Sequence, residues 1–280
     1  MAASFADKSQ SSMFTFVVGE RKTEYRVHGQ YVSALSVALD LFLAGGVNAG
    51  KVRVEWPDVD DHTFVRFIQW AYSRNYDPRE PQNDSKRTKV GGLPTSLPSA
   101  PDTNSPTSSE KRLCGLSSPE SLTKRSCIPA ESVPGSFAHE AGKKYPAPAS
   151  SIVFTPRQNT TSSEDFTEVL LCHAKLYVVG DNWLIPQLKQ LTLHRLYATL
   201  RHFILYPSRV QDICVLAEYV FENTTPGDEM RDLVIMYFAS VIDRVTDCSG
   251  VEALMDKVPG FAFQLVKMMS RKSKPIFSIY

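Results

Sequence analysis

Two neighbouring residues, Cys172 and His173, carry side chains that often bind zinc or act as a nucleophile with its base. Adjacent residues of a helix do not share a face, so this pair cannot converge on one ion or substrate atom. The chain has no Cys-x-x-Cys or His-x-x-x-His spacing, and His139-Glu140 lacks the second histidine of a zinc-protease motif. The sequence therefore predicts no metal centre.

Two pairs of acidic residues, Asp60-Asp61 and Glu164-Asp165, could act in acid–base catalysis. Each pair precedes a predicted helix, where a carboxylate accepts hydrogen bonds from free backbone N–H groups, so we expect capping. The chain has no Gly-x-Ser-x-Gly, Walker or Gly-x-Gly-x-x-Gly motif. We predict that it binds no cofactor and is not an enzyme; an enzyme of unrecognised type is the alternative. We expect His28 to form a hydrogen bond that caps a small helix.

The balance of charge limits the partners that the chain can bind. Its 280 residues include 31 basic and 30 acidic side chains, a formal net charge of +1. This balance argues against direct binding of nucleic acid. No run of about 18 apolar residues and no apolar leader is present, so we predict neither a membrane partner nor secretion. Five scattered cysteines indicate reduced thiols, as in the cytoplasm or nucleus.

The composition changes between residues 77 and 165. These 89 residues hold 12 of the 18 prolines, and Ser, Thr, Pro and Gly together supply 41 of them. Leu, Ile, Val and Phe supply only 12, below the share of about 20% that marks chains able to bury a core. We therefore predict a disordered insertion over 77–165. The remaining 191 residues suffice for one domain.

The elements before the insertion are of both kinds. Residues 14–18, 24–27 and 51–55 have the composition or alternation of strands. Apolar residues at helical spacing over 32–43 predict a helix that Gly45-Gly46 should end.

Helices dominate the rest of the chain. The helix after Asp60 should bury a stripe formed by Phe64, Phe67, Ile68, Ala71 and Tyr72. After the insertion, helices are expected at 169–180, from Pro186 to about 200, after a capping box at 208–211, after 225–228, and over 251–269 with a break at Pro259-Gly260. The order predicts an α+β fold: a small three-stranded sheet packed with helices, followed by an all-helical extension.

Several short segments occur in a fixed order: Phe16-Val17-Val18-Gly19, Tyr25-Arg26-Val27-His28, Leu35-Ser36, Val52-Arg53-Val54, Asp58-Val59-Asp60, Ala71-Tyr72, Ala174-Lys175-Leu176-Tyr177 and Asp181-Asn182-Trp183-Leu184-Ile185. This series resembles the BTB/POZ domain, with Trp183 where that family usually has Tyr. Segments 230–234 and 259–262 resemble the helical extension of fungal BTB proteins.

The resemblance implies a domain organisation, which we list in chain order: a disordered N-terminus at 1–12, BTB/POZ parts at 13–76 and 166–200 on either side of the 77–165 insertion, a helical extension at 201–270 and a tail at 271–280. It implies homodimerisation, with Val32, Leu35 and Leu39 as the candidate dimer surface. It also implies a surface for protein partners, formed by Arg74, Tyr76, Tyr197, His202 and Phe203.

The function that the resemblance implies is protein–protein interaction. The leading hypothesis is a self-associating adaptor that links a substrate to a cullin-type ubiquitin ligase. The insertion occupies a crossing that carries part of the cullin contact in family members, which leaves cullin binding open. The alternative is a non-degradative scaffold or nuclear regulatory protein, in which the basic clusters at 86–89, 111–112 and 124–125 and the sites Ser105-Pro106, Ser118-Pro119 and Thr155-Pro156 would matter.

Overall fold

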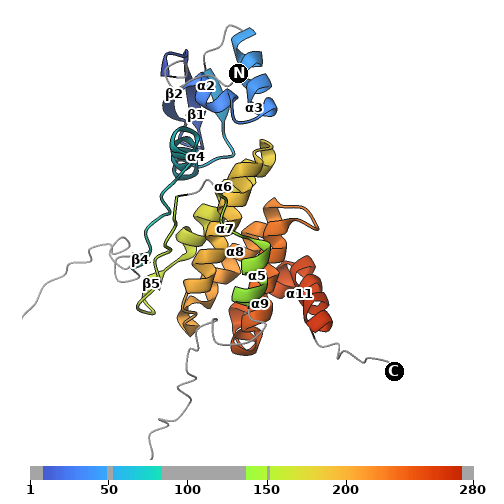
Figure 1. The fold of residues 1–280 in the computed structure, drawn as a ribbon. Coiled ribbons are helices and arrows are strands. Elements are labelled where there is room, and N and C mark those ends of the chain that lie inside the picture. The colour runs from blue at the N-terminus through green and yellow to red at the C-terminus, as the bar shows by residue number, and fades with distance from the viewer. Residues whose placement is uncertain (1–8, 49–52, 84–136, 150–151, 273–280) are drawn as a thin grey trace, which may run out of the picture.

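The computed structural model describes residues 9–48, 53–83, 137–149 and 152–272 (Figure 1). Strands and short helices at the N-terminal end form one half of the molecule, and a bundle of longer helices forms the other (Figure 1). The prediction of an α+β fold with a small three-stranded sheet is confirmed.

The sheet has the strand order β2-β1-β3. β1 (Met13–Val18) and β2 (Thr23–His28), at two of the predicted strand segments, form an antiparallel hairpin, and β3 (Arg53–Trp56) lies parallel to β1. The hairpin turn needs left-handed backbone at Gly19, whose φ is +66°, and glycine adopts this conformation at little cost.

Three helices accompany the sheet: α2 (Gly29–Ser33), α3 (Val37–Asn48) and α4 (Asp61–Ser73). The prediction that Gly45-Gly46 ends a helix is wrong, because α3 continues through both residues. Glycine weakens a helix by about 1 kcal/mol but does not forbid helical backbone. The cap of α4 is confirmed: an Asp60 carboxylate oxygen accepts from the Thr63 N–H at 3.0 Å.

The helical half contains α6 (Thr167–Asn182), α7 (Pro186–His202), α8 (Val210–Asn223), α9 (Glu229–Val245), α10 (Ser249–Lys257) and α11 (Pro259–Lys272). Pro186 opens α7 as predicted. The predicted capping box at 208–211 is wrong, because a 3₁₀ turn (Pro207–Arg209) precedes α8 and the Ser208 hydroxyl donates instead to the Ser162 carbonyl.

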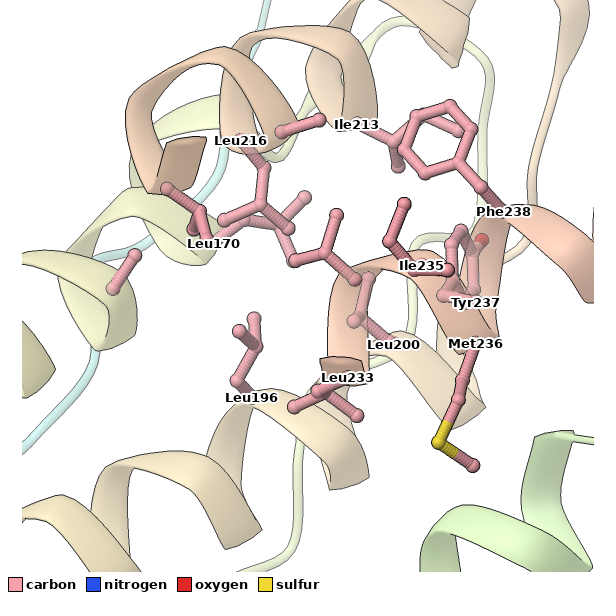
Figure 2. Close-up of a cluster of buried hydrophobic side chains, with 14 of the residues drawn as sticks. Leu170, Leu196, Leu200, Ile213, Leu216, Leu233, Ile235, Met236, Tyr237 and Phe238 are labelled. Atoms are coloured by element: carbon pink, nitrogen blue, oxygen red, sulfur yellow. The ribbon is translucent and has the colours of Figure 1, made fainter. Parts of the chain in front are cut away.

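Helices α6 and α7 contribute to both hydrophobic cores. Cys172 and Leu176 of α6 pack with the sheet half, whereas Leu170 and Tyr177 pack with the helical half. Figure 2 shows side chains of α6, α7, α8 and α9 converging in the helical core. One core therefore spans the predicted boundary at residue 200.

The described parts of the 77–165 segment differ from the predicted disordered insertion. β4 (Gln82–Asn83) pairs antiparallel with β5 (Glu164–Asp165), which brings the two ends of the segment together. α5 (Phe137–Lys144) buries Phe137 and Ala141 completely in the helical core. An average over 89 residues hides this short amphipathic stretch. Residues 84–136 and 150–151, with all three basic clusters, lie outside the described residues.

Polar contacts hold α5 between α7 and α9. The Tyr197 hydroxyl donates to the Ala138 carbonyl at 2.9 Å, and the Tyr145 hydroxyl donates to the Glu229 carbonyl at 3.0 Å. The predicted disorder of 1–12 is also wrong for residues 9–12, because the Ser12 carbonyl accepts from the Gly29 N–H at 2.9 Å.

Candidate interaction surfaces

The predicted dimer surface of Val32, Leu35 and Leu39 is not on the outside of the molecule. Val32 and Leu39 are fully buried against the sheet, and Leu35 is half-buried. That prediction is wrong because Val32 of α2 and Leu39 of α3 both belong to the core around the sheet. Helix α3 is apolar on both sides, and the side with Leu39 and Leu43 is the buried one.

The opposite side of α3 is the apolar surface that the prediction missed. Val37 and Leu41 lie one turn apart and are 76% and 68% exposed, and Ala44 is exposed one turn further on. We call these three residues the α3 face. Their spacing is visible in the sequence, but periodicity alone cannot tell which of two apolar stripes faces the core.

A hollow of about 430 Å³ lies beside the α3 face. Ser12, Gln30 and Ser33 give it polar walls, and Phe14 and Leu43 supply apolar surface. Asp40 and Ala44 line its edge on α3. The N-terminal half thus presents an apolar helix face next to an open depression.

The five residues of the predicted partner surface do not form one surface. Tyr76, Tyr197 and Phe203 are buried, so the prediction is wrong for these three aromatic residues. Their rings pack inside: Phe203 lies 5.4 Å from Phe166, and Tyr197 lies 5.7 Å from Phe137, between ring centroids. Arg74 is exposed and His202 is half-buried.

Arg74 borders a groove of about 460 Å³, which we call the Arg74 groove. Apolar side chains of Leu35, Trp70 and Leu191 line it, together with Gln187 and Gln190. The Arg74 guanidinium lies 4.9 Å above the Trp70 ring, and the residue adopts left-handed backbone with φ +58°. Within the described residues no carboxylate pairs with Arg74, so its charge is available to an acidic partner.

A buried polar cluster joins the two halves of the molecule, and it explains why Tyr76 is not on the surface. We define the Arg195 cluster as Tyr76, Phe154, His173, Arg195 and Thr199. The Arg195 guanidinium donates to the Tyr76 carbonyl and the Asn75 side chain, and it lies 4.3 Å from the Tyr76 ring and 4.7 Å from the Phe154 ring.

His173 completes the Arg195 cluster. Its Nδ1 lies 2.8 Å from the Tyr76 hydroxyl and its Nε2 lies 3.3 Å from the Thr199 hydroxyl. Burial, with the nearby charges of Arg195 and Arg66, lowers the pKa of His173 to about 3. A neutral, fully enclosed histidine with two hydroxyl partners is a structural residue.

We expect His173 to make the free energy of unfolding depend on pH. In the unfolded chain its pKa is about 6.5, so the unfolded state binds a proton as pH falls below that value, whereas the folded state does not until about pH 3. The residue should therefore lower the free energy of unfolding by about 1.4 kcal/mol between pH 7.5 and 5.5. Urea unfolding at both pH values measures this. His173→Gln should remove the loss, and His139→Gln on an exposed site should leave it.

His28 is the N-cap residue of α2 and is hydrogen-bonded, as predicted, but its side chain bonds to Tyr72 instead of to the helix backbone. Its Nδ1 lies 2.8 Å from the Tyr72 hydroxyl, and its backbone N–H donates to the same hydroxyl at 3.0 Å. Tyr72 in turn stacks on Tyr31, with 4.1 Å between ring centroids. These contacts fix α2 against α4.

The paired acids are engaged in the structure. Burial acts to raise the pKa of Asp60, but hydrogen bonds from Thr63 and Lys175 outweigh it and lower that pKa. Asp61 pairs with Arg21, and Asp165 accepts from the Thr167 N–H at 2.8 Å. Asp60 and Asp61 border a groove of about 700 Å³ between α4, α6 and α8, yet both carboxylates already have cationic partners.

No group of three or more His, Cys, Asp or Glu side chains in the described part of the chain is placed to hold a metal ion. No helix over these residues is long and apolar enough to cross a membrane. No protein-family model, curated protein or solved structure matches the chain.

Proposed function

We propose that this chain is a protein-interaction module that pairs with a second copy of itself through the α3 face. The observation that carries the proposal is the exposure of Val37 and Leu41 on a helix whose other side is buried. Burying apolar surface contributes about 25 cal/mol per Å², so such a face gains free energy from a partner. Contiguous exposed apolar residues commonly mark protein-binding surfaces.

We infer a second copy as the partner, because two-fold symmetry lets one apolar patch meet the same patch of another chain. A two-fold axis brings the same patch of both copies together, so each projecting α3 face meets its equivalent and the hollow beside it. The resemblance to BTB/POZ domains supports self-association, although it implied Val32, Leu35 and Leu39 as the surface; the exposure of Val37 and Leu41 is what places the pairing on the α3 face. The segments before residue 77 that carry the resemblance fall, in the same order, on the β1–β2 hairpin, the residues between α2 and α3, β3 with the residues just before it, and α4 with the residues just before it.

The Arg74 groove is the surface that we propose for a different protein. Its apolar lining, and the Arg74 guanidinium that pairs with no carboxylate of the described residues, suit a segment with an acidic residue beside an apolar one. A cullin scaffold is the partner that the BTB/POZ resemblance implies, which would make the chain a ubiquitin-ligase adaptor. A non-degradative scaffold would use the same groove for another protein.

Leu41→Asp tests the proposed pairing. A carboxylate at the centre of the α3 face would have to lose its hydration in the dimer, so we expect the dissociation constant to rise at least about 100-fold. Sedimentation equilibrium of the full chain measures this. Phe263→Asp is the matched control, because Phe263 is equally exposed on α11 and should leave pairing unchanged. Equal self-association of both variants would contradict the placement on α3.

A further inference from the structure

Helix α11 has exposed apolar residues on the side that faces away from the helical core. Its inner side is buried: Phe261 lies 4.8 Å from Phe238 and 5.6 Å from Phe221, between ring centroids. On the outer side, Phe263 is 71% exposed and Val266 is 63% exposed. We call these two residues the α11 face. The helix lies at the edge of the helical half (Figure 1).

The charges on α11 itself are basic. Lys267 and Arg271 are exposed and follow Phe263 at intervals of four residues, so the three side chains form one row along the helix. Helices α10 and α11 together contain four basic and two acidic residues. Over residues 259–280 the sequence has four basic residues and no acidic one.

We propose that α11 binds to the surface of an anionic lipid bilayer. Phe263 and Val266 would enter the boundary between headgroups and acyl chains, while Lys267 and Arg271 reach lipid phosphates. Helices that lie in the membrane interface bury apolar side chains while their Lys and Arg side chains extend to the headgroups, and the outer side of α11 offers both kinds of side chain. Basic side chains near an anionic leaflet add electrostatic attraction.

The α3 face and the α11 face differ in the charged residues beside them, and we use this difference to infer which partner each face binds. The α3 face has Asp40 beside it and α3 contains no Lys or Arg, so an anionic surface would repel it. The α11 face has only basic neighbours on its own helix. The expectation of no membrane partner came from the lack of a spanning segment, and a helix that lies on the surface does not need one.

Co-sedimentation with vesicles tests the proposal on the full chain. The probes are phosphatidylcholine vesicles and vesicles that contain about one third phosphatidylserine. We expect binding to the anionic vesicles at about 0.05 M salt and its loss at about 0.5 M, because salt screens the attraction. Phe263→Asp should weaken binding at least about tenfold, because it replaces the apolar side chain with a carboxylate that the anionic lipids repel. Lys267→Glu should do the same through charge alone.

Leu41→Asp is the matched control, because it changes the other exposed apolar face and should not alter the contact with the vesicle. The proteins are compared at concentrations below the dissociation constant of the proposed dimer, so that a difference in pairing does not affect vesicle binding. Far-ultraviolet circular dichroism confirms that each variant is folded. No sedimentation of the wild-type chain with anionic vesicles would overturn the proposal. Equal binding by Phe263→Asp, or equal binding to neutral vesicles, would also overturn it.

Discussion

Phe137→Ala is expected to lower the free energy of unfolding by about 3–5 kcal/mol, the usual cost of removing a buried phenylalanine. The ring is fully buried, 5.7 Å from Tyr197 and 5.3 Å from Tyr237 between ring centroids. The substitution would leave a cavity among α5, α7 and α9 and remove the main apolar contact of α5. This large effect would come from a residue inside the segment of lowest apolar content.

Urea unfolding of the full chain measures this cost. Phe263→Ala is the matched control, because the same substitution at a 71% exposed site should change stability by less than about 0.5 kcal/mol. If Phe137→Ala costs no more than Phe263→Ala, α5 does not belong to the core.

Arg195→Ala is expected to destabilise the protein by about 3–5 kcal/mol, as breaking a buried charged network does. The substitution removes the donors that satisfy the Tyr76 carbonyl and the Asn75 side chain, and it removes the cation between the Tyr76 and Phe154 rings. Buried acceptors without donors each cost about 1–3 kcal/mol. Removing Arg195 also removes the free-energy cost of burying its charge, and this gain offsets part of the destabilisation.

The position of the loss distinguishes this cluster from a general core effect. Amide hydrogen exchange should accelerate most over 75–83 and 152–158, because Arg195 holds both segments against α7. Arg201→Ala, on the exposed side of the same helix, should cost less than about 1 kcal/mol. Arg195→Lys should not restore stability, because an ammonium cannot donate to both acceptors and stack on both rings. Full stability of Arg195→Lys would show that charge alone suffices.

Local signals predicted the N-terminal elements well. The Asp60 cap and the spacing of Phe64 and Phe67 lie within eight residues of one another. They predict where α4 begins and which side of it is buried without information from distant parts of the chain. The pairing of β1 with β2 also fits a local signal, the glycine in the turn between them, whereas the parallel pairing of β1 with β3 has no such signal. One local prediction, the helix end at Gly45-Gly46, is wrong, and most of the others that are wrong concern contacts between residues far apart in the sequence. Tyr76 is buried because it meets His173, 97 residues away, and Arg195, 119 residues away.

The insertion shows the same limit. Asn159 matches a glycosylation pattern, yet it is fully buried and exchanges two hydrogen bonds of 2.7 Å with the backbone of Ile204. Neither that pairing nor the docking of α5 leaves a trace in composition, because each depends on where distant helices lie. A deletion designed to test the insertion should therefore remove 84–136 and keep α5 and residues 152–165.

The molar mass of the wild-type chain in solution tests the proposed pairing most directly. The chain has a mass of 31.3 kDa, and light scattering at tens of micromolar should give twice that value. Dilution should return the mass toward that of one chain, and Leu41→Asp should give one chain throughout. A wild-type chain that stays at 31.3 kDa at tens of micromolar would contradict the proposal that the α3 face binds a second copy.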